Sequence, residues 1–498
     1  MTIGRGIRCA AVRAPNKPAL ILGKSKLSYR DLVRRMAQVA NMARDEFALK
    51  PGDRAAIIAP NCLPFVEVVA GLSDVGVIVA TLSPKLSPNE LMDILDDCTP
   101  RLIIVHPDCA GLVQSAGDCG AKVLSLGAPY EALLAAAPDT ATLPFMDETE
   151  PFALAYTSGT TGRPKGVLLS HRSRAITFMA MAAEYQCFGP DDCFLALAPM
   201  CHGAGFVFAC ASLYFGGTTV LFEKADPEAI LTRIGQRDIS GVFMVPTHFA
   251  RIFELPQAKL AAYRDHALKT IISNAAALPQ IMKERAVSHF GEGLLHETYG
   301  STEGGIVTNI RPADLLRKTG SVGHPFPMTA VELRRADGSI AGPGEPGELF
   351  CSGPASFNGY WQRPDETAAT LVDGWVTVGD VAMADEDGFI TIVDRKKDMV
   401  VTGGMNVYPR EVENVIARLP GVRDVAVIGK PSAEWGESLH AFIVRSSGAQ
   451  LNSENIIAGC RDRLASFKIP RDVSFIDELP RNAGGKVLKT VLREKHLP

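Results

Sequence analysis

The chain has 498 residues, of which 47% are hydrophobic and 21% charged, and its formal net charge is −4. This length exceeds what one hydrophobic core supports, so we expect two or more domains. The nearly balanced charge gives no reason to expect nucleic acid or an anionic membrane surface as a partner.

Short apolar strand patterns alternate with helical patterns in the N-terminal half. From Tyr29 onward, apolar residues recur at helical spacing with charges on the opposite face. In chain order, we expect a helix at 29–47, a strand at 54–59, a helix at 64–75, a strand at 77–81, a helix at 88–98 and a strand at 102–105. This alternation is typical of an α/β fold with a largely parallel sheet.

Residues 193–222 contain no Asp, Glu, Lys or Arg, and the length of this apolar run alone would suit a membrane span. However, Pro and Gly residues interrupt it, among them Pro199, Gly203 and Gly216. These breakers predict a buried strand, a turn, a helix and another turn, with no span.

The pattern changes from about Thr329, where Asp-Gly and Pro-Gly turns separate short strands and predict a small β subdomain. A charged run at 394–398 then lies between two strand-like segments, and such a run is usually a solvated turn. Beyond it we expect a helix at 409–419, strands at 425–428 and 441–444, and a helix at 456–465. These elements would form a compact α+β domain of roughly a hundred residues.

The eleven cysteines are scattered, without CxxC pairs or metal-ligand spacing. This usage suits free thiols in a reducing compartment. The first residues lack an apolar signal core, and the last ones do not form a peroxisomal tripeptide. We therefore expect a cytoplasmic protein.

The segment 156–167 has the composition of a phosphate-holding loop, and a strand-like run at 152–156 leads into it. Gly159 and Gly162 allow a tight turn and a close backbone approach to an anion. Ser and Thr hydroxyls can donate to phosphate oxygens, Lys165 adds positive charge, and successive N–H groups form an anion-binding concavity. The spacing is not that of a Walker A loop, because no Ser or Thr follows Lys165.

This segment resembles the signature of the adenylate-forming superfamily, which contains acyl-CoA synthetases, amino-acid-adenylating domains and luciferases. Later segments resemble further motifs of that superfamily in the same order, at 299–303, 377–380, 394–398, 403–409 and 480–486. The resemblance covers nearly the whole chain and is closest to acyl- or aryl-acid CoA ligases. It implies a large N-terminal domain of α/β subdomains plus a small β subdomain at 1–393. It also implies a hinge at 394–398, with Lys397 at its pivot. A small mobile α+β C-terminal domain at 399–498 would come after the hinge.

The activity implied is an ATP-dependent ligase that works in two steps. The carboxylate of a small acid attacks the α-phosphorus of ATP, giving an acyl-adenylate and pyrophosphate. Coenzyme A then displaces AMP to give acyl-CoA. The first step is an in-line displacement at phosphorus, so positioning and charge neutralisation dominate its catalysis. The implied cofactors are ATP, Mg²⁺ and coenzyme A.

The resemblance implies a role for each residue of the nucleotide site. Glu303 would bind Mg²⁺, Thr302 would donate to the α-phosphate, and Tyr299 would offer an aromatic face to adenine. Asp380 would accept from the ribose hydroxyls beside Arg395. The implied ATP- and AMP-binding residues are Thr157, Ser158, Gly159, Thr160, Thr161, Gly162, Lys165, Ala275, Ala276, Tyr299, Gly300, Thr302, Asp380 and Arg395.

The C-terminal segments would supply one group to each step. Lys486 follows a double-glycine turn and would bridge the incoming carboxylate and the α-phosphate. A rotation about Lys397 would withdraw it and bring in the 403–406 loop, whose small residues would let a thin pantetheine arm pass. Trp435 is either a stacking partner for the nucleotide of coenzyme A or a core residue. The implied catalytic residues are Lys486, Thr302, Glu303 and His202, and the implied coenzyme A-binding residues are Gly403, Gly404, Met405, Trp435, Phe467 and Lys468, with Arg471 near the phosphates.

The acid pocket would be formed by His202, Ala204, Phe206, Gly305 and Ile306. The 199–206 segment has no Asp to pair with an ammonium group, which disfavours amino acids. Malonate-activating relatives carry an Arg just before the position of Tyr299, whereas this chain has Thr298. We therefore expect an uncharged acyl or aryl group, with its chain length and its aromatic or aliphatic character left open.

The chain departs from commoner versions of the family at 273–276, where a glycine-containing turn is replaced, and at Gly304–Gly305. The two glycines would either open the pocket to a bulkier acid or loosen its floor. Other functions also stay open. An adenylating enzyme that loads a separate carrier protein is the main alternative, followed by a luciferase-like oxygenase and a non-catalytic nucleotide sensor. The oligomeric state is undecided.

Overall fold

The computed structural model describes residues 1–157, 164–403, 405–432, 434–461, 463–481 and 487–496. The chain forms two compact units. The first contains Met1–Val331 and Cys351–Val376, and the second contains Glu332–Phe350 and Thr377–Pro498.

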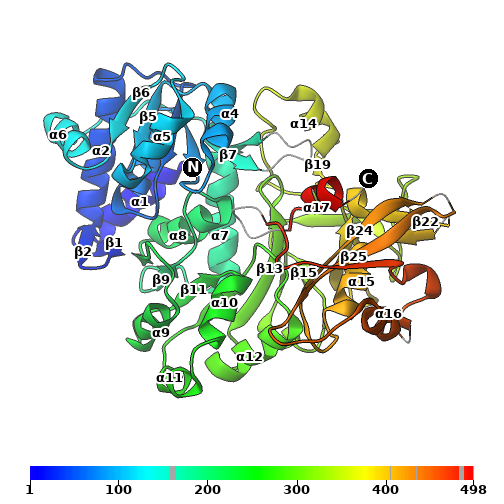
Figure 1. Cartoon of the computed structure of the whole chain (residues 1–498). Coiled ribbons are helices and arrows are strands. Elements are labelled where there is room, and N and C mark those ends of the chain that lie inside the picture. The colour runs from blue at the N-terminus through cyan, green and yellow to red at the C-terminus, as the bar shows by residue number, and fades with distance from the viewer. Residues whose placement is uncertain (158–163, 404, 433, 462, 482–486, 497–498) are drawn as a thin grey trace. The chain divides into compact units, whose positions relative to one another are not determined.

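One sheet of the first unit has six strands in the order β6-β5-β3-β4-β7-β8. All neighbouring strands are parallel except β7 and β8, which form an antiparallel hairpin (Figure 1). Its central strands are continuous apolar runs because helices cover both faces of a parallel sheet. The strands are β3 (Arg54–Ile58), β4 (Ile78–Leu82), β5 (Leu102–Val105), β6 (Lys122–Ser125), β7 (Pro151–Thr157) and β8 (Lys165–Ser170).

A second sheet of this unit has nine strands in the order β15-β14-β13-β12-β11-β9-β10-β1-β2. Its interior pairs are parallel, and β2, β14 and β15 at the two edges are antiparallel to their neighbours. The strands are β1 (Pro18–Leu22), β2 (Ser25–Ser28), β9 (Cys193–Ala196), β10 (Thr218–Leu221), β11 (Gly241–Met244), β12 (Thr270–Ser273), β13 (Leu295–Ser301), β14 (Gly305–Ile310) and β15 (His324–Pro325).

Helices flank these strands and begin at local sequence signals. Ser28 caps the helix that starts at Tyr29, because its hydroxyl accepts from the Asp31 N–H. Ser87 and Glu90 form a capping box at the start of α4. The helices are α1 (Ile3–Arg13), α2 (Tyr29–Asp45), α3 (Leu63–Ser73), α4 (Pro88–Cys98), α5 (Ala110–Ala116), α6 (Ala128–Ala136), α7 (His171–Tyr185), α8 (Gly203–Phe215), α9 (Pro227–Gly235), α10 (Pro246–Phe253), α11 (Gln257–Ala262), α12 (Gln280–Phe290), α13 (Pro312–Leu315) and α14 (Pro364–Thr370).

The apolar segment 193–222 forms a buried strand, a buried helix and a second strand. The predicted final turn is present at Gly216–Gly217. The strand that follows it, Thr218–Leu221, pairs with both β1 and β9 as β10 and was not predicted. Among the described residues, no helix combines the length and hydropathy needed to cross a membrane. The prediction of core over membrane is confirmed for this segment.

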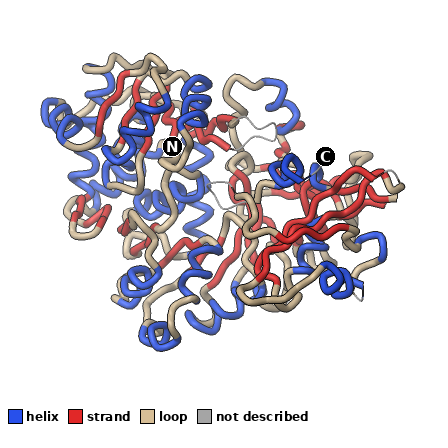
Figure 2. The backbone as a smooth tube through the Cα atoms, viewed as in Figure 1, coloured by secondary structure: helices blue, strands red, loops and turns tan. Residues whose placement is uncertain are grey.

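The second unit contains a five-stranded sheet in which β23-β22-β25-β24 are neighbours in that order and β26 pairs with β25. Separately, β20 and β21 form an antiparallel pair, and Gly347 and Glu348 of β17 pair with β20. Figure 2 draws the strands in red and the helices in blue. The elements are β16 (Ala330–Arg334), β17 (Gly347–Ser352), β20 (Asp380–Ala384), β21 (Ile390–Arg395), β22 (Val400–Thr402), β23 (Met405–Val407), α15 (Pro409–Ile416), β24 (Val422–Ser432), β25 (Gly436–Arg445), α16 (Ser453–Arg461), β26 (Asp472–Phe475) and α17 (Lys489–His496).

The predicted hinge run begins on β21 and continues into a short 3₁₀ turn, Lys396–Asp398. Its last three residues separate β21 from β22. The role of residues 394–398 as a hinge between two domains stays a prediction. The α/β fold class, with a large N-terminal and a small C-terminal part, is confirmed.

Candidate active site

The phosphate-loop segment connects the two strands of a hairpin. Thr157 at the end of β7 lies opposite Lys165 at the start of β8, so the ladder fixes both ends of the segment. This differs from a Walker A loop, which leads from a strand into a helix. The assignments of Ser158, Gly159, Thr160, Thr161 and Gly162 fall outside the described residues and stay predictions.

A further stretch of chain lies alongside β8. The N–H of Leu168 donates to the carbonyl of Gly359, and the N–H of Trp361 donates to the carbonyl of Gly166 at 2.8 Å. An isolated antiparallel bridge joins Val167 to Tyr360 between them. The backbone of Tyr360 is therefore tied to the hairpin that holds the phosphate-loop segment.

The side chain of Tyr360 links Lys165 to Glu303. The Nζ atom of Lys165 lies 5.3 Å from the centre of the Tyr360 ring and 3.5 Å from Oε2 of Glu366. The Tyr360 hydroxyl donates to Oε1 of Glu303 at 2.8 Å. Burial, together with the Glu303 charge, raises the pKa of Tyr360, so its hydroxyl stays protonated and keeps donating.

Glu303 lies in the turn between β13 and β14 and is 8% exposed. In the described ranges, no Lys or Arg forms an ion pair with it. A cluster of three or more His, Cys, Asp or Glu side chains suited to a metal is also absent from them. The buried carboxylate of Glu303 could contribute one ligand to a metal that is also bound by phosphates and water. Mg²⁺ suits this arrangement, because it usually takes one or two carboxylates together with phosphates.

Tight packing explains the glycines around Glu303. A Cβ on Gly300 would lie 2.1 Å from the carbonyl oxygen of Gly305, and one on Gly304 would lie 2.6 Å from Sγ of Cys351. Gly305 has a φ of 72°, which favours glycine, and Ala355 occupies the space beside it. Packing and backbone conformation therefore account for both Gly304 and Gly305.

The segment that replaces a glycine-containing turn is held by Asn274. Its amide donates to the carbonyl of Thr298 at 3.1 Å and to the Thr298 hydroxyl at 2.7 Å. Its side-chain oxygen accepts from the Ala275 N–H. Ala275 has a φ of 76°, a left-handed value that a glycine would adopt without strain. Ala275 and Ala276 are exposed, and their role at the adenine edge stays a prediction.

His202 is the N-cap residue of α8 and is half-buried. Burial lowers the pKa of His202, and the positive charge of Lys85 lowers it further, so the imidazole is neutral at pH 7. Gly205 lets α8 approach the preceding turn, since a Cβ there would lie 2.0 Å from the carbonyl oxygen of Pro199. Thr81 on β4 donates to the carbonyl of Cys201 at 3.1 Å.

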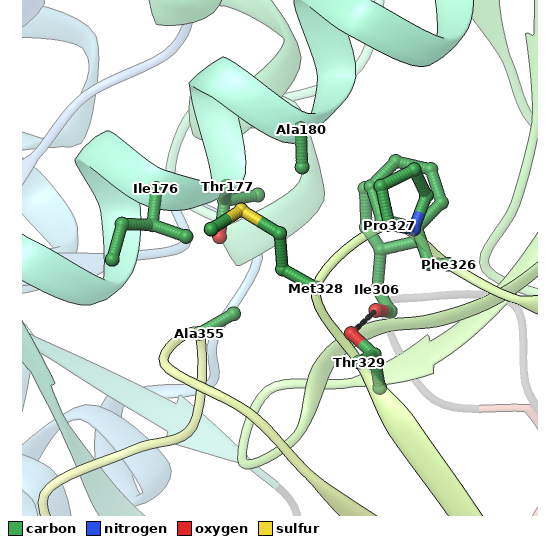
Figure 3. Close-up of a pocket in the computed structure, with 9 residues that line it drawn as sticks. All are labelled: Ile176, Thr177, Ala180, Ile306, Phe326, Pro327, Met328, Thr329 and Ala355. Carbon is green, nitrogen blue, oxygen red and sulfur yellow. Dashed lines mark hydrogen bonds between the residues drawn. The ribbon is translucent and has the colours of Figure 1, made fainter.

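Two cavities adjoin the predicted acid pocket. The first, about 10 Å³, lies between α7 and the start of β14 (Figure 3). The Met328 side chain points toward Ile176 and Thr177, and Thr329 donates to the carbonyl of Ile306 at 3.3 Å. The second, about 20 Å³, is lined by Gly203 and Phe206 of α8. The first is lined by Ile176, Thr177, Ala180, Ile306, Phe326, Pro327, Met328, Thr329 and Ala355.

Ile306 lines the first cavity and Phe206 the second, and their role in binding the acid stays a prediction. Three other predicted pocket residues, His202, Ala204 and Gly305, line neither of these two cavities. The apolar character expected of the pocket holds for the first cavity, where Thr177 and Thr329 are the polar residues.

In the second unit, the predicted ribose-binding residues contact one another. Asp380 and Arg395 lie opposite each other on β20 and β21, and Nε of Arg395 is 3.1 Å from Oδ1 of Asp380. Asp380 is 6% exposed. The guanidinium holds the carboxylate in place across the ladder, which is the geometry needed to present its oxygens to a diol.

Charged side chains surround the predicted pivot. Burial lowers the pKa of Lys397, with Arg395 and Arg493 adding repulsion. Arg493 on α17 pairs with Asp398 at 2.9 Å. The carboxylate of Asp394 accepts from the backbone N–H of Arg395 and, at 2.8 Å, from that of Arg410. These contacts fix both ends of the short turn.

The predicted coenzyme A-binding residues are only partly brought together. Gly403 has a φ of 57°, its N–H donates to the Trp435 carbonyl at 2.8 Å, and a Cβ there would lie 2.9 Å from the indole ring. The guanidinium carbon of Arg471 lies over the Trp435 ring, 4.5 Å from its centre. Met405 is 50% exposed. Gly404 lies outside the described residues.

Lys468 and Phe467 are held within the second unit. Lys468 donates to both oxygens of Glu411 at 2.7 Å, and Phe467 packs against the core beneath β24 and β25. Lys486, the predicted adenylation lysine, lies outside the described residues. Its role stays a prediction.

Comparison with known proteins agrees with this geometry. Residues 7–361 match the AMP-binding enzyme family, and residues 411–486 match the AMP-binding enzyme C-terminal domain. The chain belongs to this family. The adenylate-forming resemblance is thereby confirmed.

Relatives of this AMP-binding enzyme align along nearly their whole length. A feruloyl-CoA synthase of Amycolatopsis sp is 36% identical over 487 residues, which are 97% of this chain and 96% of the relative. A long-chain-fatty-acid–CoA ligase of Escherichia coli O6:H1 is 30% identical, covering 98% of this chain and 93% of the relative. The ATP-bound structure of MatB from Rhodopseudomonas palustris has a TM-score of 0.90 at 30% identity, covering 100% of this chain and 99% of MatB.

This AMP-binding enzyme is an acid–thiol ligase, an AMP-forming acyl- or aryl-acid–CoA ligase that uses ATP and a carboxylic acid. The prediction of function is confirmed at that level. Sequence reasoning missed Tyr360 and Glu366, because neither lies in a motif that was singled out. The aromatic Phe357–Trp361 stretch was the available signal, since aromatic residues in a loop often mark a contact with a site.

Proposed function

We propose that this enzyme joins an acid with an apolar body to free coenzyme A through an acyl-adenylate. The observation that carries the proposal is the contact chain from Lys165 through Tyr360 to Glu303. It places a cation from the phosphate-loop hairpin and a buried carboxylate on opposite sides of one tyrosine. A nucleoside triphosphate with its divalent cation needs this pairing of charges.

Glu303 would hold Mg²⁺ together with phosphate oxygens, and the metal would neutralise charge on the leaving pyrophosphate. Tyr360 orients the carboxylate by donating to one of its oxygens. Thr302 follows β13 next to Glu303 and is half-exposed, which suits a donor to the α-phosphate. Lys165 is 14% exposed and would exchange its contact with Glu366 for a phosphate oxygen. Charge-assisted hydrogen bonds of this kind contribute roughly 1.5–3 kcal/mol each.

Separate groups would bind the adenine and the ribose. Exposed Ala275 and Ala276 would offer an edge, and half-buried Tyr299 a ring, to the adenine. Asp380, oriented by Arg395 in the second unit, would accept from both ribose hydroxyls. Lys486 would supply the cation that bridges the carboxylate and the α-phosphate in the first step.

The acid would enter past His202, whose neutral imidazole places no charge on the path. Its body would pack against the apolar side chains between α7 and β14, where the cavity of about 10 Å³ would have to widen to admit it (Figure 3). Aromatic acids come first among the candidates, because a relative at 36% identity is a feruloyl-CoA synthase.

Coenzyme A would be accepted by the Gly403 loop and Trp435. The indole Nε1 of Trp435 is buried without a hydrogen-bond partner among the described residues, so it is available to an incoming carbonyl or phosphate. Arg471 stacks on the same ring and adds positive charge. Rotation about Lys397 would bring these groups into use for the second step.

An acid panel with ATP, Mg²⁺ and free coenzyme A tests the proposal, with AMP, pyrophosphate and thioester followed together. Wild type is compared with Lys486→Ala and with Lys489→Ala, whose lysine instead forms a half-buried ion pair with Glu413 within the second unit. We expect Lys486→Ala to lose about 10²–10³-fold in adenylate formation and to keep thioester formation from a synthetic acyl-adenylate. Adenylate without thioester would indicate a carrier-protein acceptor, and normal turnover in Lys486→Ala would contradict the proposal.

A further inference from the structure

Arg174 is a buried arginine without a counter-ion. It is the fourth residue of α7 and is 4% exposed. In the described part of the chain, no hydrogen bond or ion pair reaches its guanidinium. Buried arginines are almost always paired, because an uncompensated buried charge is strongly destabilising. Burial alone lowers the pKa of Arg174 to about 10, so the side chain is still charged at pH 7.

The side chain lines the 20 Å³ cavity described above, which is large enough for a small group, since one water needs roughly 10–15 Å³. Thr81 is the other polar side chain in the lining, and its hydroxyl already donates to the Cys201 carbonyl. A Cβ on Gly203 would meet nothing within 4 Å, so α8 leaves open space on this side. The lining residues are Val69, Thr81, Phe152, Ala153, Ala155, Leu169, Arg174, Gly203 and Phe206.

This cavity belongs to the acid-binding region. Gly203 and Phe206 follow His202 on the first turn of α8, and Ala155 on β7 immediately precedes the phosphate-loop segment. One turn further along α7, Ile176 and Thr177 line the apolar cavity proposed for the body of the acid. Residues of one helix therefore line both the cavity that contains Arg174 and the apolar cavity.

We infer that Arg174 binds an anionic group at the far end of the acid, so that the substrate is an acid with an apolar body and a second carboxylate. The inference rests on the proposed function and revises the uncharged acyl group expected from Thr298. The planar guanidinium matches a carboxylate with two parallel hydrogen bonds. The apolar walls would strengthen that pairing by excluding water. Lys85, which is close enough to lower the pKa of His202, adds positive potential near His202, where the acid is proposed to enter.

The test compares matched acids that differ only in the second carboxylate, hexanoic with adipic acid and cinnamic with 4-carboxycinnamic acid. The measured quantity is the ratio of kcat/KM for the dicarboxylic acid to that for its partner, from AMP release. The variants are Arg174→Met, Arg174→Lys and the control Arg172→Met, which removes an exposed arginine two residues earlier on the same helix. Arg174→Met removes a buried charge without a partner, so we expect it to fold with an unchanged or higher Tm.

We expect wild type and Arg172→Met to favour the dicarboxylic member of a pair. In Arg174→Met the ratio should fall at least 10²-fold, and in Arg174→Lys it should fall less. Without ATP, the dicarboxylic acid should raise the Tm of wild type and not that of Arg174→Met. An equal ratio in wild type and Arg174→Met, or a Tm shift that both acids produce alike, would overturn the inference.

Different results would refute the proposed ligase reaction and the proposed anion site at Arg174. If none of the acids yields AMP while the Tm shift by the dicarboxylic acid still depends on Arg174, the anion site stands and the ligase reaction proposed for these acids does not. If AMP is released only with monocarboxylic acids, the ligase stands and the anion site does not.

Discussion

The Tyr360 hydroxyl donates a hydrogen bond to Oε1 of Glu303 at 2.8 Å, while the face of the same ring carries Lys165. One side chain therefore orients the carboxylate proposed for the metal and the cation proposed for the phosphates. Both contacts come from a residue outside the motifs that reveal the family.

Replacing Tyr360 by Phe tests this arrangement. The ring and its contact with Lys165 remain, but Glu303 loses its donor. We expect kcat/KM for ATP to fall about 10- to 100-fold, the value of one hydrogen bond to a charged group, with a higher Mg²⁺ requirement. AMP release at varied ATP and Mg²⁺ measures both. Tyr263→Phe is the control, because it removes a hydroxyl that contacts Thr232 on the exposed surface. Equal effects of the two changes would contradict the assignment.

Gly403→Ala should separate the two half-reactions. The new Cβ would lie 2.9 Å from the Trp435 ring at a left-handed φ of 57°, so the loop must shift. Gly448→Ala is the matched control, because Gly448 has a φ of 77° and nothing within 4 Å of an added Cβ. We expect Gly403→Ala to slow thioester formation about 10-fold or more while adenylate formation changes little. Pre-steady-state assays of each step provide the readout, and a loss confined to adenylate formation would refute the loop's role.

His171 should make the first unit sensitive to acid. Burial, aided by the N-terminal ammonium, lowers the pKa of His171 from 6.5 to about 4. The folded protein thus binds fewer protons than the unfolded chain between these values. The free energy of unfolding is therefore unaffected by His171 titration above pH 6.5. It decreases by up to about 3 kcal/mol as the pH falls from 6.5 toward 4.

The variant His171→Phe keeps a ring for the stacking contact with Phe152, whose centre is 5.2 Å away. It loses the acceptor for the Ile3 N–H. We expect a lower free energy of unfolding at pH 7 but a shallower decline toward pH 4 than in wild type. Urea unfolding at several pH values measures this slope. Parallel curves for the two proteins would show that His171 does not titrate as stated.

Most regular elements follow from local pattern. The helix at 88–98 and the strand at 102–105 match α4 and β5 residue for residue, because a capping box and a fully buried apolar run mark them. The strand at 218–221 was missed because its pairing with β1 spans about two hundred residues, and no local turn signal reveals such a partner.

The contact between Asp380 and Arg395 was predictable because each residue lies in a motif that the sequence reveals. The candidate site was not predictable where the partner lies elsewhere in the chain. Nothing near Glu303 in the sequence points to Tyr360, and Arg174 reads as an ordinary surface position between Ser173 and Ala175 on a helix. Only tertiary packing shows that one forms a key hydrogen bond and that the other is buried without an anion.

The backbone contacts between β8 and residues 358–361 have a mechanical consequence. Because Tyr360 is anchored to the hairpin through its main chain and to Glu303 through its hydroxyl, any displacement of the hairpin on phosphate capture is passed on to that carboxylate. Phosphate binding and the position of the proposed metal ligand Glu303 would then change together. An analogue that does not bind through its phosphates would leave the Glu303 carboxylate wrongly placed. Tyr360 couples the position of the hairpin to the position of this carboxylate.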